Sequence, residues 1–576
     1  MSEVSTIFQD LLQESRARWQ SLTSGELPWI RVGSALCGEA AGANEVVSAV
    51  ENSLTNRGLK AQLSRVGCIG LCFAEPILDI QLPGQSRVFY GNVTSESVDQ
   101  IIESHLMEET PLSDLALGWL GESSVERIDY LNDHPMKAKE NRVALRNAGH
   151  IDPSDIYQYI NNEGYSALNK ALSEGSPEDT LEQVNLSGLR GRGGAAFATA
   201  TKWRFLAGSN APVKYVLCNC EEGDPGAFND KGILESDPHT VIEGIILAGY
   251  ATGARYGYIF IRHGHDGPVR QAQTAIKQAY QLGLLGNNIL GTEFSFDLEV
   301  ALTGDSYVAG EETALMEAIE GSRAMPRFRP PFPAQVGVFG KPTNINNVKT
   351  LAYVPEIVAK GGEWFANIGY EQSTGTAILC LSGTLKYTGM VEVPMGVTLR
   401  DVLYETAGGV PGGKSLKLVQ TGGPLGGVLA ADSVDMVLDF ETFRNAGAIL
   451  GSGGIIAADE DTCIVDLTRL LIAFCQYESC GKCFPCRMGM SHLLEVLERI
   501  SNLQGTDDDL ELMRKIGENM QAGSLCGHGQ LGFNPVSSAL KYFSAEFEDH
   551  ISNHNCATGS CNAIRFSPKL SRRPAS

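Results

Sequence analysis

The amino-acid sequence predicts a multidomain α/β protein, and three observations support this prediction. The chain has 576 residues, which is more than one domain because domains average roughly 150 residues. Apolar residues make up 43% and charged residues 20% of the chain, the composition of an ordinary globular protein. Between residues 181 and 370, predicted strands and helices alternate, which is typical of βαβ units around a mainly parallel sheet.

The charge balance excludes some classes of partner. Lys and Arg number 45 against 68 Asp and Glu, so the net charge is −23. We therefore expect no unaided binding to nucleic acids or anionic membranes, because such binding requires Lys and Arg to neutralise phosphates. We expect neither a membrane-inserted segment nor a secretory signal. The 14 cysteines are then expected in the cytoplasm, where clustered thiols indicate metal or redox chemistry.

Residues 25–110 have a thioredoxin-like α/β pattern. WIRVGSALC and LKAQLSRVG are predicted strands, and between them ANEVVSAVENSLTNRG is a predicted amphipathic helix closed by Gly58. A helix near SESVDQIIESHL completes this unit. Residues 111–180 are charged and mostly helical, and we expect them to form a connector.

The remaining chain divides into four predicted regions. Residues 181–370 form a Rossmann-like α/β domain. Residues 371–455 have short strands and a small helix at TLRDVLYETAGG, a pattern that resembles a ubiquitin-like β-grasp module. Residues 456–552, with segments such as HLLEVLERISNL and DLELMRKIGENMQAG, predict a helical bundle. Residues 553–576 form a tail that contains cysteines.

The strongest motif is ESCGKCFPCRMG, which places Cys480, Cys483 and Cys486 at C-x2-C-x2-C spacing; Cys526 follows in SLCGHGQ. Three thiolates in a tight loop and one distant thiolate suit the corners of a [4Fe-4S] cluster. Structural zinc sites usually take their cysteines as two C-x2-C pairs. The motif therefore predicts a [4Fe-4S] cluster, and zinc or unligated thiols are the alternatives.

A second motif, SGLRGRGGAAFATATKW, predicts a phosphate site. Four glycines fall within Gly188–Gly194, just before a predicted helix that carries Lys202. Free amides, a helix N-terminus and a lysine together can bind a phosphate, although such a loop can also be an ordinary turn. The motif is not a P-loop, and it precedes its strand instead of following one, which excludes the usual dinucleotide fingerprint.

These motifs carry a family resemblance. GLRGRGGAAF, CNCEEGDPGAF, GEETAL, RPPFPAQVGVFGKPTNINNVKT and ESCGKCFPCR…SLCGHGQ occur in the order found in the flavin-binding subunit of NADH dehydrogenases. The resemblance covers roughly residues 170–550. In layout the chain is most similar to the diaphorase subunits of soluble NAD-linked hydrogenases and formate dehydrogenases, and to their electron-bifurcating relatives.

The resemblance implies particular cofactor contacts. FMN would be bound by glycine amides, a lysine and polar residues near strand ends, namely Gly191, Gly193, Lys202, Asn219, Glu221, Glu222, Gly310, Asn346, Asn347 and Thr350. NADH would be bound by aromatic rings around its adenine and by acidic residues, namely Phe197, Phe205, Asp224, Glu311, Glu312 and Phe332. Asp224 matches a carboxylate that would repel the 2′-phosphate of NADP, so NAD is the expected substrate.

Several of these residues also have a structural interpretation. A phenylalanine belongs more often to a core than to a cofactor platform. Glu311 and Glu312 could stabilise the N-terminus of a helix through its dipole. Cys220 is interpreted as a small buried residue with no catalytic role.

The N-terminal domain departs from its relatives, which hold a [2Fe-2S] cluster on four cysteines. Cys37, Cys68 and Cys72 match three of these, but CGEAAGAN places Ala41 and Gly42 where the fourth is expected. Three thiolates could hold the cluster only with a different or external fourth ligand. The sequence favours a docking domain without a cluster over an intact [2Fe-2S] site.

A second group of cysteines lies near the C-terminal end. Cys463, Cys556 and Cys561 together with one histidine would be the ligand set of a closed structural zinc site. His550 is preferred to His554 because it would face inward at the end of the helix FSAEFEDHI. The alternative is a frayed tail with two idle thiols.

The resemblance implies that NADH passes a hydride to the flavin, which then releases single electrons to the [4Fe-4S] cluster and on to partner subunits. No catalytic side chain is expected, because the cofactors carry the redox chemistry. Two alternatives remain open: a non-catalytic iron–sulfur scaffold subunit, and a peripheral subunit of a membrane redox ion pump. The terminal partner (hydrogenase, formate dehydrogenase, quinone, ferredoxin or aromatic-ring reductase) also remains open.

Overall fold

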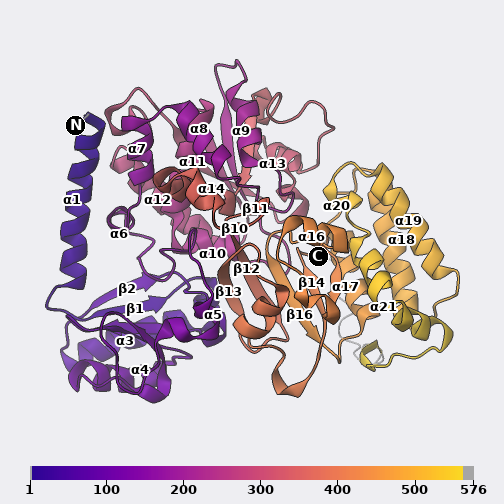
Figure 1. Ribbon diagram of the computed structural model, residues 1–576, viewed down its shortest axis with the longest axis horizontal. Helices are drawn as coiled ribbons and strands as arrows, with labels where there is room; N and C mark the ends of the chain where they lie inside the picture. The colour runs from indigo at the N-terminus through magenta and orange to yellow at the C-terminus, as the bar shows by residue number, and fades with distance from the viewer. Residues whose placement is uncertain (1–2, 562–576) are drawn as a thin grey trace.

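A computed structural model describes residues 3–561 of the chain (Figure 1). The predicted tail is therefore described only as far as Cys561, and its residues 562–576 lie outside the described residues. The described chain is mixed α/β, with one four-stranded, two five-stranded and one two-stranded sheet. Its C-terminal helices gather at the opposite end of the molecule from the N-terminal helix α1 (Glu3–Thr23) (Figure 1).

The N-terminal sheet has the strand order β2-β1-β3-β4-β5. Its strands are β1 (Trp29–Gly33), β2 (Gln62–Val66), β3 (Leu78–Gln81), β4 (Arg87–Tyr90) and β5 (Ala116–Leu120). Strands β1 and β2 are parallel, and the other pairs are antiparallel. Helices α3 (Ala43–Arg57) and α4 (Ser95–Ile102) share a buried apolar cluster with the sheet.

One feature of this region differs from the expectation, and the packing of the first helix adds to it. Strand β5 lies inside the segment that is predicted to be a helical connector. Its sequence, ALGWL, is too short to show the alternating pattern of a strand, but in the structure it pairs with the edge of β4. Helix α1 packs mainly against α6 (Ile156–Asn161) and α7 (Ser166–Glu174), where Val4 and Phe8 join the core of the central domain (Figure 1). Near its C-terminal end, Trp19 contacts Trp29 of β1, with ring centroids 5.7 Å apart.

The central sheet confirms the predicted parallel arrangement. Its order is β8-β7-β6-β9, and all neighbours are parallel. The strands are β6 (Tyr215–Cys220), β7 (Tyr256–Arg262), β8 (Asp297–Thr303) and β9 (Thr343–Asn347). Helices α11 (Pro238–Thr252), α12 (Asp266–Gln281) and α14 (Val348–Lys360) pack into the same core. Parallel strands end at one edge of a sheet, and ligands of such sheets bind at that edge.

The second five-stranded sheet has the order β13-β12-β16-β14-β15, with β12 and β16 parallel. Its strands are β12 (Thr376–Gly383), β13 (Gly389–Pro394), β14 (Leu416–Thr421), β15 (Val428–Ala430) and β16 (Gly454–Asp459). Strand β16 runs past the expected boundary at residue 455, so this sheet ends later than predicted.

The C-terminal helices confirm the helical pattern predicted after the second sheet. They are α17 (Ile464–Tyr477), α18 (Phe484–Ser501), α19 (Asp509–Gly523), α20 (Gly527–Gln530) and α21 (Asn534–Ser552), which pack around one buried apolar cluster. No helix within residues 3–561 combines the length and the hydrophobicity that crossing a bilayer requires.

Candidate active site

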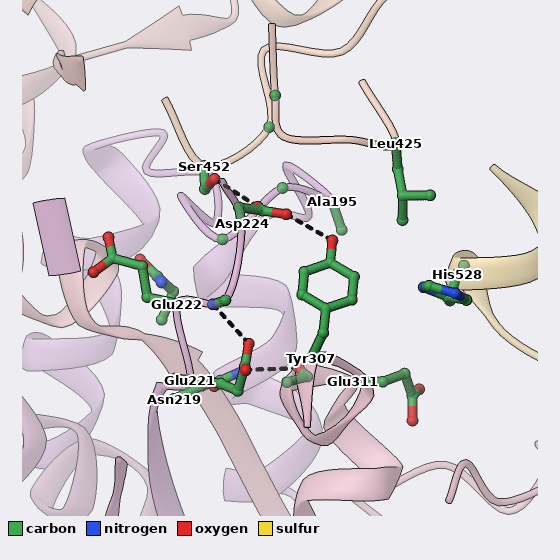
Figure 2. Close-up of a pocket in the computed structure, with 18 of the residues that line it drawn as sticks. Ala195, Asn219, Glu221, Glu222, Asp224, Tyr307, Glu311, Leu425, Ser452 and His528 are labelled. Atoms are coloured by element: carbon green, nitrogen blue, oxygen red, sulfur yellow. Dashed lines mark hydrogen bonds between the residues drawn. The ribbon is translucent and has the colours of Figure 1, made fainter. Parts of the chain in front are cut away.

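A cavity of about 360 Å³ lies where three parts of the chain meet (Figure 2). The glycine-rich loop and the segments after β6 and β8 form one side, loops next to β14 and β16 form another, and the start of α20 completes it. Its lining residues include Gly193, Gly194, Ala195, Asn219, Glu221, Glu222, Asp224, Tyr307, Gly310, Glu311, Asn347, Ser452, Gly527 and His528. The cavity is thus at the carboxyl ends of β6 and β9, as expected for a parallel sheet.

The glycine-rich loop contributes free amides to this cavity. Within the described residues, the amides of Gly193, Gly194 and Ala195 have no hydrogen-bond acceptor, and all three residues line the cavity. Gly191 differs from the expectation, because its amide donates to the Phe197 carbonyl at 2.8 Å and is used inside the loop. Three consecutive free amides suit a phosphate group.

The end of β6 places two of the predicted FMN residues in the cavity. Asn219 Nδ2 donates to the Gly310 carbonyl at 2.9 Å, and Asn219 Oδ1 accepts from the Glu221 amide at 3.2 Å. Glu221 pairs with Arg262, whose Nη1 lies 3.0 Å from Glu221 Oε1. Burial nevertheless raises the pKa of Glu221 to about 8, although Arg262 and the Gly223 amide act to lower it.

Glu222 lines the cavity, but its carboxylate is bonded to the chain itself. It accepts from the amides of Asp230 and Lys231, at 2.7 and 2.8 Å, in the first turn of α10 (Asn229–Ser236). Burial, with the nearby Asp230 carboxylate, raises the pKa of Glu222 to about 7. Its side chain thus fixes the start of α10 against the cavity.

Asp224 lies at the centre of a short hydrogen-bonded chain (Figure 2). The Tyr307 hydroxyl donates to Asp224 Oδ1 at 2.6 Å, and the Ser452 hydroxyl donates to Asp224 Oδ2 at 2.8 Å. Burial raises the pKa of Asp224 above its usual value. These bonds join the loop after β6 to the loop before β16 across the cavity.

Besides Gly191, three predicted FMN residues lie outside the cavity lining. Lys202, in α9 (Thr199–Ala207), donates from Nζ to the Ile345 carbonyl at 2.6 Å and lies 3.5 Å from Glu312. Asn346 is buried and accepts from the Trp203 indole at 3.3 Å. The Thr350 hydroxyl accepts from the amide of Arg192 at 2.9 Å, so it supports the glycine-rich loop from beneath.

The three predicted phenylalanines are on the surface and are not core residues. Their exposed fractions are 51% for Phe197, 59% for Phe205 and 54% for Phe332. None of them lines the cavity. The exposure excludes the core-packing interpretation and leaves each ring free to stack on a planar ligand.

The two glutamates of the GEET motif have different positions. Glu311 lines the cavity, and its carboxylate also caps α13 (Glu312–Ile319) by accepting from the amides of Thr313 and Ala314, at 2.9 and 3.0 Å. Glu312 lies outside the lining and pairs with Arg329, at 2.7 Å between Nη1 and Oε1. The helix-capping interpretation thus applies to Glu311.

The four cysteines of the strongest motif come together beside the cavity. Cys480 and Cys483 lie in the loop before α18, Cys486 is already in the first turn of that helix, and Cys526 precedes α20. Burial, together with the neighbouring thiols Cys483, Cys526 and Cys480, raises the pKa of Cys486 to about 12. Thiols held in this way would ionise together only on binding a metal.

The sequence did not single out Tyr307, Ser452 or His528 as cavity residues. His528 follows Cys526 within SLCGHGQ; its Nε2 lies 2.8 Å from the Cys475 carbonyl oxygen, and its buried Nδ1 has no partner in the described chain. The Tyr307 ring packs on His528 with centroids 5.7 Å apart. The SLCGHGQ motif could have identified His528 as a cavity residue, whereas no local sequence pattern identifies Tyr307 or Ser452.

Two further groups of candidate ligands come together outside this cavity. Cys463, His550, Cys556 and Cys561 are all buried, and their ligand atoms lie within 4.8 Å of one another. Cys37, Cys68 and Cys72 also have their sulfur atoms within 4.8 Å of one another. The buried Cys220 is not part of any such group among the described residues.

Comparison with known proteins identifies the family. Residues 184–356 match the model of the Nuo51 FMN-binding domain, and residues 466–550 match the NADH-ubiquinone oxidoreductase-F iron-sulfur binding region. The NADP-reducing hydrogenase subunit HndC of Solidesulfovibrio fructosivorans is 43% identical over 426 residues, which are 74% of this chain and 86% of that protein. The F 2 subunit of the NADH-quinone oxidoreductase of Rhizobium meliloti (strain 1021) is 42% identical over 414 residues, 72% of this chain and 98% of that relative.

A solved structure extends the similarity along almost the whole chain. The NAD+-reducing [NiFe]-hydrogenase in its H2-reduced state matches with a TM-score of 0.64 and 27% identity, over 97% of this chain and 92% of that one. The sequence relatives and both family models agree with the resemblance carried by the motifs. The chain therefore belongs to the family of NADH-quinone oxidoreductase F subunits, with their FMN-binding domain and [4Fe-4S] region.

Proposed function

We propose that this chain is the NADH-oxidising or NAD-reducing flavoprotein subunit of a multisubunit redox complex. One observation carries the proposal: Gly527 and His528, which directly follow Cys526, line the same cavity as the free amides of the glycine-rich loop. The flavin site and the [4Fe-4S] site are therefore neighbours. Electrons could pass between them without a large motion of the protein.

The cavity residues fit FMN. The free amides of Gly193, Gly194 and Ala195 would hold its phosphate, and Asn219, Gly310 and Glu221 would face its polar groups. When bound, FMN supplies the exchange between two-electron hydride transfer and one-electron transfer. The unpartnered Nδ1 of His528 offers a further acceptor beside the cluster.

The side chains of this site control charge and position. The raised pKa of Glu221 and the positive charge of Arg262 beside it limit the negative charge that an anionic cofactor meets. The Tyr307–Asp224–Ser452 chain holds two walls of the cavity at a fixed separation. Cys480, Cys483, Cys486 and Cys526 would hold the [4Fe-4S] cluster.

For the nicotinamide cofactor we propose NAD(H), with the exposed rings of Phe197, Phe205 and Phe332 stacking around its adenine. The Asp224 carboxylate supports NAD over NADP, because it would repel a 2′-phosphate. The relatives include both an NADP-reducing and an NAD+-reducing hydrogenase, so membership of the family does not by itself select the cofactor.

We also propose the β-grasp module, the thioredoxin-like unit, the cytoplasmic location and the partner subunits that the sequence predicts. Strand order β13-β12-β16-β14-β15 with a parallel β12–β16 pair supports a β-grasp module, and the mixed N-terminal sheet supports a thioredoxin-like unit. All 14 cysteines are free, which supports a reducing, cytoplasmic setting. The partners would be iron–sulfur and terminal oxidoreductase subunits, since the relatives include subunits of hydrogenases and of quinone-linked enzymes.

A structural zinc ion is proposed for the second cysteine group. Cys463 Sγ lies 3.4 Å from His550 Nε2 and 3.5 Å from Cys561 Sγ, and Cys556 completes the group. Three thiolates and one imidazole at this spacing fit tetrahedral zinc. Metal analysis should show that Cys556→Ser and His550→Ala each lose about one zinc relative to the unmodified chain, while His554→Ala loses none. A zinc content unchanged in both ligand variants would contradict the assignment.

The experiment that tests the function uses the full chain reconstituted with FMN, iron and sulfide. NADH should bleach the flavin absorbance and support reduction of ferricyanide and viologens. Cys526→Ser should keep flavin bleaching but lose the signal of the reduced cluster in electron paramagnetic resonance. A chain that binds no flavin, or whose flavin is not reduced by NADH, would favour the scaffold alternative.

A further inference from the structure

A third ligand group lies at the junction between the N-terminal sheet and the rest of the chain. Cys37 belongs to α2 (Leu36–Ala41), and Cys68 and Cys72 come from the loop after β2. Cys68 Sγ and Cys72 Sγ are 3.8 Å apart, and all three sulfur atoms lie within 4.8 Å of one another. The carboxylate of Glu75 lies beside this triangle of sulfur atoms, with Oε1 at 3.7 Å from Cys37 Sγ, although it is not one of the atoms that all lie within 4.8 Å of one another.

This arrangement does not fit the [2Fe-2S] cluster of related N-terminal domains. A two-iron cluster requires two pairs of ligands, each pair on its own iron, so that ligands of different irons stand well apart. Here the three thiols form one compact triangle instead of two separated pairs. No fourth cysteine joins them in the described part of the chain.

We propose that Cys37, Cys68, Cys72 and Glu75 bind a single zinc ion. Zinc–sulfur bonds of about 2.3 Å place the sulfur atoms of a tetrahedral site about 3.8 Å apart. The separation of Cys68 Sγ and Cys72 Sγ is 3.8 Å. Zinc accepts a carboxylate oxygen beside thiolates, and four such ligands leave no open position.

Glu75 has the position and environment of a metal ligand. Its side chain is 8% exposed, and it forms no ion pair within residues 3–561. Oε2 accepts from the Ile77 amide at 2.8 Å, which leaves Oε1 directed toward the thiols. The backbone of Gly33 passes so near that an added Cβ would lie 3.1 Å from Oε2. A buried carboxylate without a basic partner is costly, and a bound cation would offset that cost.

The surroundings indicate a structural role for this zinc. The loop that carries two of the cysteines docks on β13, where Gly70 accepts from the Met390 amide at 2.9 Å. The amide of Leu36, next to Cys37, donates to Glu235 Oε2 at 2.9 Å. Zinc has no redox chemistry, so the ion would fix the N-terminal unit on the flavin domain and would carry no electrons.

The first test uses the full chain with Cys556→Ser, which removes the zinc proposed for the C-terminal group. We expect about one zinc to remain, with an X-ray absorption spectrum of three sulfur ligands and one oxygen and no imidazole signal. Two results would overturn the proposal. One is iron with acid-labile sulfide at this site, and the other is the absence of zinc from the Cys556→Ser chain. If the C-terminal group binds no zinc, the same spectrum should be seen in the unmodified chain.

The second test changes the ligands themselves. Cys72→Ser should remove this zinc, and Glu75→Gln should weaken zinc binding at least tenfold in competition with a chelator. Glu39→Gln is the matched control, because Glu39 is a neighbouring acid of α2 that pairs with Arg270 and lies outside the group. Flavin content verifies that each variant is folded. Unchanged zinc affinity in the folded Glu75→Gln variant would show that Glu75 is not a ligand.

Discussion

At the scale of single residues, the cavity is acidic by composition but much less so by charge. Glu221, Glu222 and Asp224 all have a raised pKa because they are buried, and the values reach about 8 for Glu221 and about 7 for Glu222. Their carboxyl groups are also bonded to amides, hydroxyls or Arg262. Burial thus weakens the negative charge that the two glutamates present to an anionic FMN phosphate. The repulsion proposed for a 2′-phosphate depends on Asp224, whose carboxylate accepts from two hydroxyls.

The first prediction concerns the choice between NADH and NADPH. Asp224→Asn should raise the ratio of kcat/KM for NADPH over NADH about tenfold, because removing one charge near a 2′-phosphate is worth roughly 1–2 kcal/mol at an effective dielectric near 20. Tyr307→Phe is the control: it removes the hydroxyl that donates to Asp224 but keeps the negative charge. Steady-state kinetics with both cofactors measures the ratio. An equal rise in the two variants would mean that cavity geometry, and not charge, selects the cofactor.

The second prediction concerns pH and Glu221. A folded-state pKa of about 8, above the usual carboxyl value, means that the folded state keeps a proton that the unfolded chain loses. Its contribution to stability is therefore present at low pH and is lost as the pH rises toward 8. In the flavin-free chain, Glu221→Gln should reduce the fall in Tm between pH 6 and pH 8 by roughly 2 °C or more.

The control for this measurement is Glu126→Gln. Glu126 is an exposed glutamate whose side chain is 89% accessible, far from the cavity lining. Its substitution should leave the pH dependence of Tm as it is in the unmodified chain. If Glu221→Gln has the same effect as Glu126→Gln, Glu221 is already ionised in the folded protein at pH 6.

At the scale of secondary-structure elements, strong local sequence patterns were sufficient to predict the helices that contain them. The helix predicted from ANEVVSAVENSLTNRG is α3, and Gly58 closes it in the left-handed conformation with φ of 64°. Weak or overlapping signals were not sufficient. Strand β5 forms only because the edge of β4 is available, and α18 begins before Cys486, so that the cysteine motif is partly helical. Local sequence cannot specify a pairing that depends on a distant edge.

The third prediction concerns the glycine-rich loop. At Gly193 a Cβ atom would lie 3.0 Å from Asn347 Cβ. At Gly191 it would meet the backbone of Phe197, at 3.5 Å from the carbonyl oxygen and 3.8 Å from the nitrogen, which are ordinary contacts. Gly193→Ala should therefore displace the amides beside the cavity and weaken FMN binding at least tenfold. Gly191→Ala should bind FMN nearly as the unmodified chain does. Flavin fluorescence titration measures both affinities. An equal loss of FMN affinity in the two variants would show that Gly191 also belongs to the FMN site.

At the scale of the whole molecule, the site exists only because three parts of the chain meet. The sequence identified the glycine-rich loop and the cysteine motif, since each is a local pattern. It could not place Ser452 beside Asp224 or His528 beside Tyr307, because those contacts depend on how the second sheet and the helical bundle dock on the parallel sheet. The position of the N-terminal unit is likewise a result of docking, through the loop that carries Gly70.

The last prediction tests that docking. Gly70 has φ of 96°, and a Cβ there would lie 2.2 Å from the Met390 carbonyl oxygen of β13. Gly84 has φ of 71°, but a Cβ there would meet nothing within 4 Å. Gly84→Ala should cost only the left-handed backbone strain, about 1–2 kcal/mol. Gly70→Ala has the same strain and an overlap with the backbone of β13, so its cost should be at least twice as large.

Hydrogen exchange separates the two effects in space. In Gly70→Ala, exchange should accelerate across β1, β3 and the loop that docks on β13, because the whole N-terminal unit loses its support. In Gly84→Ala, faster exchange should be confined to the turn between β3 and β4, because the added Cβ at Gly84 would meet no other atom within 4 Å. Amides of the parallel sheet should keep their protection in both variants, since its four strands pair with one another and not with the docked loop. Equal local effects in the two variants would mean that the N-terminal unit is held by other contacts, such as the bond from the Leu36 amide to Glu235.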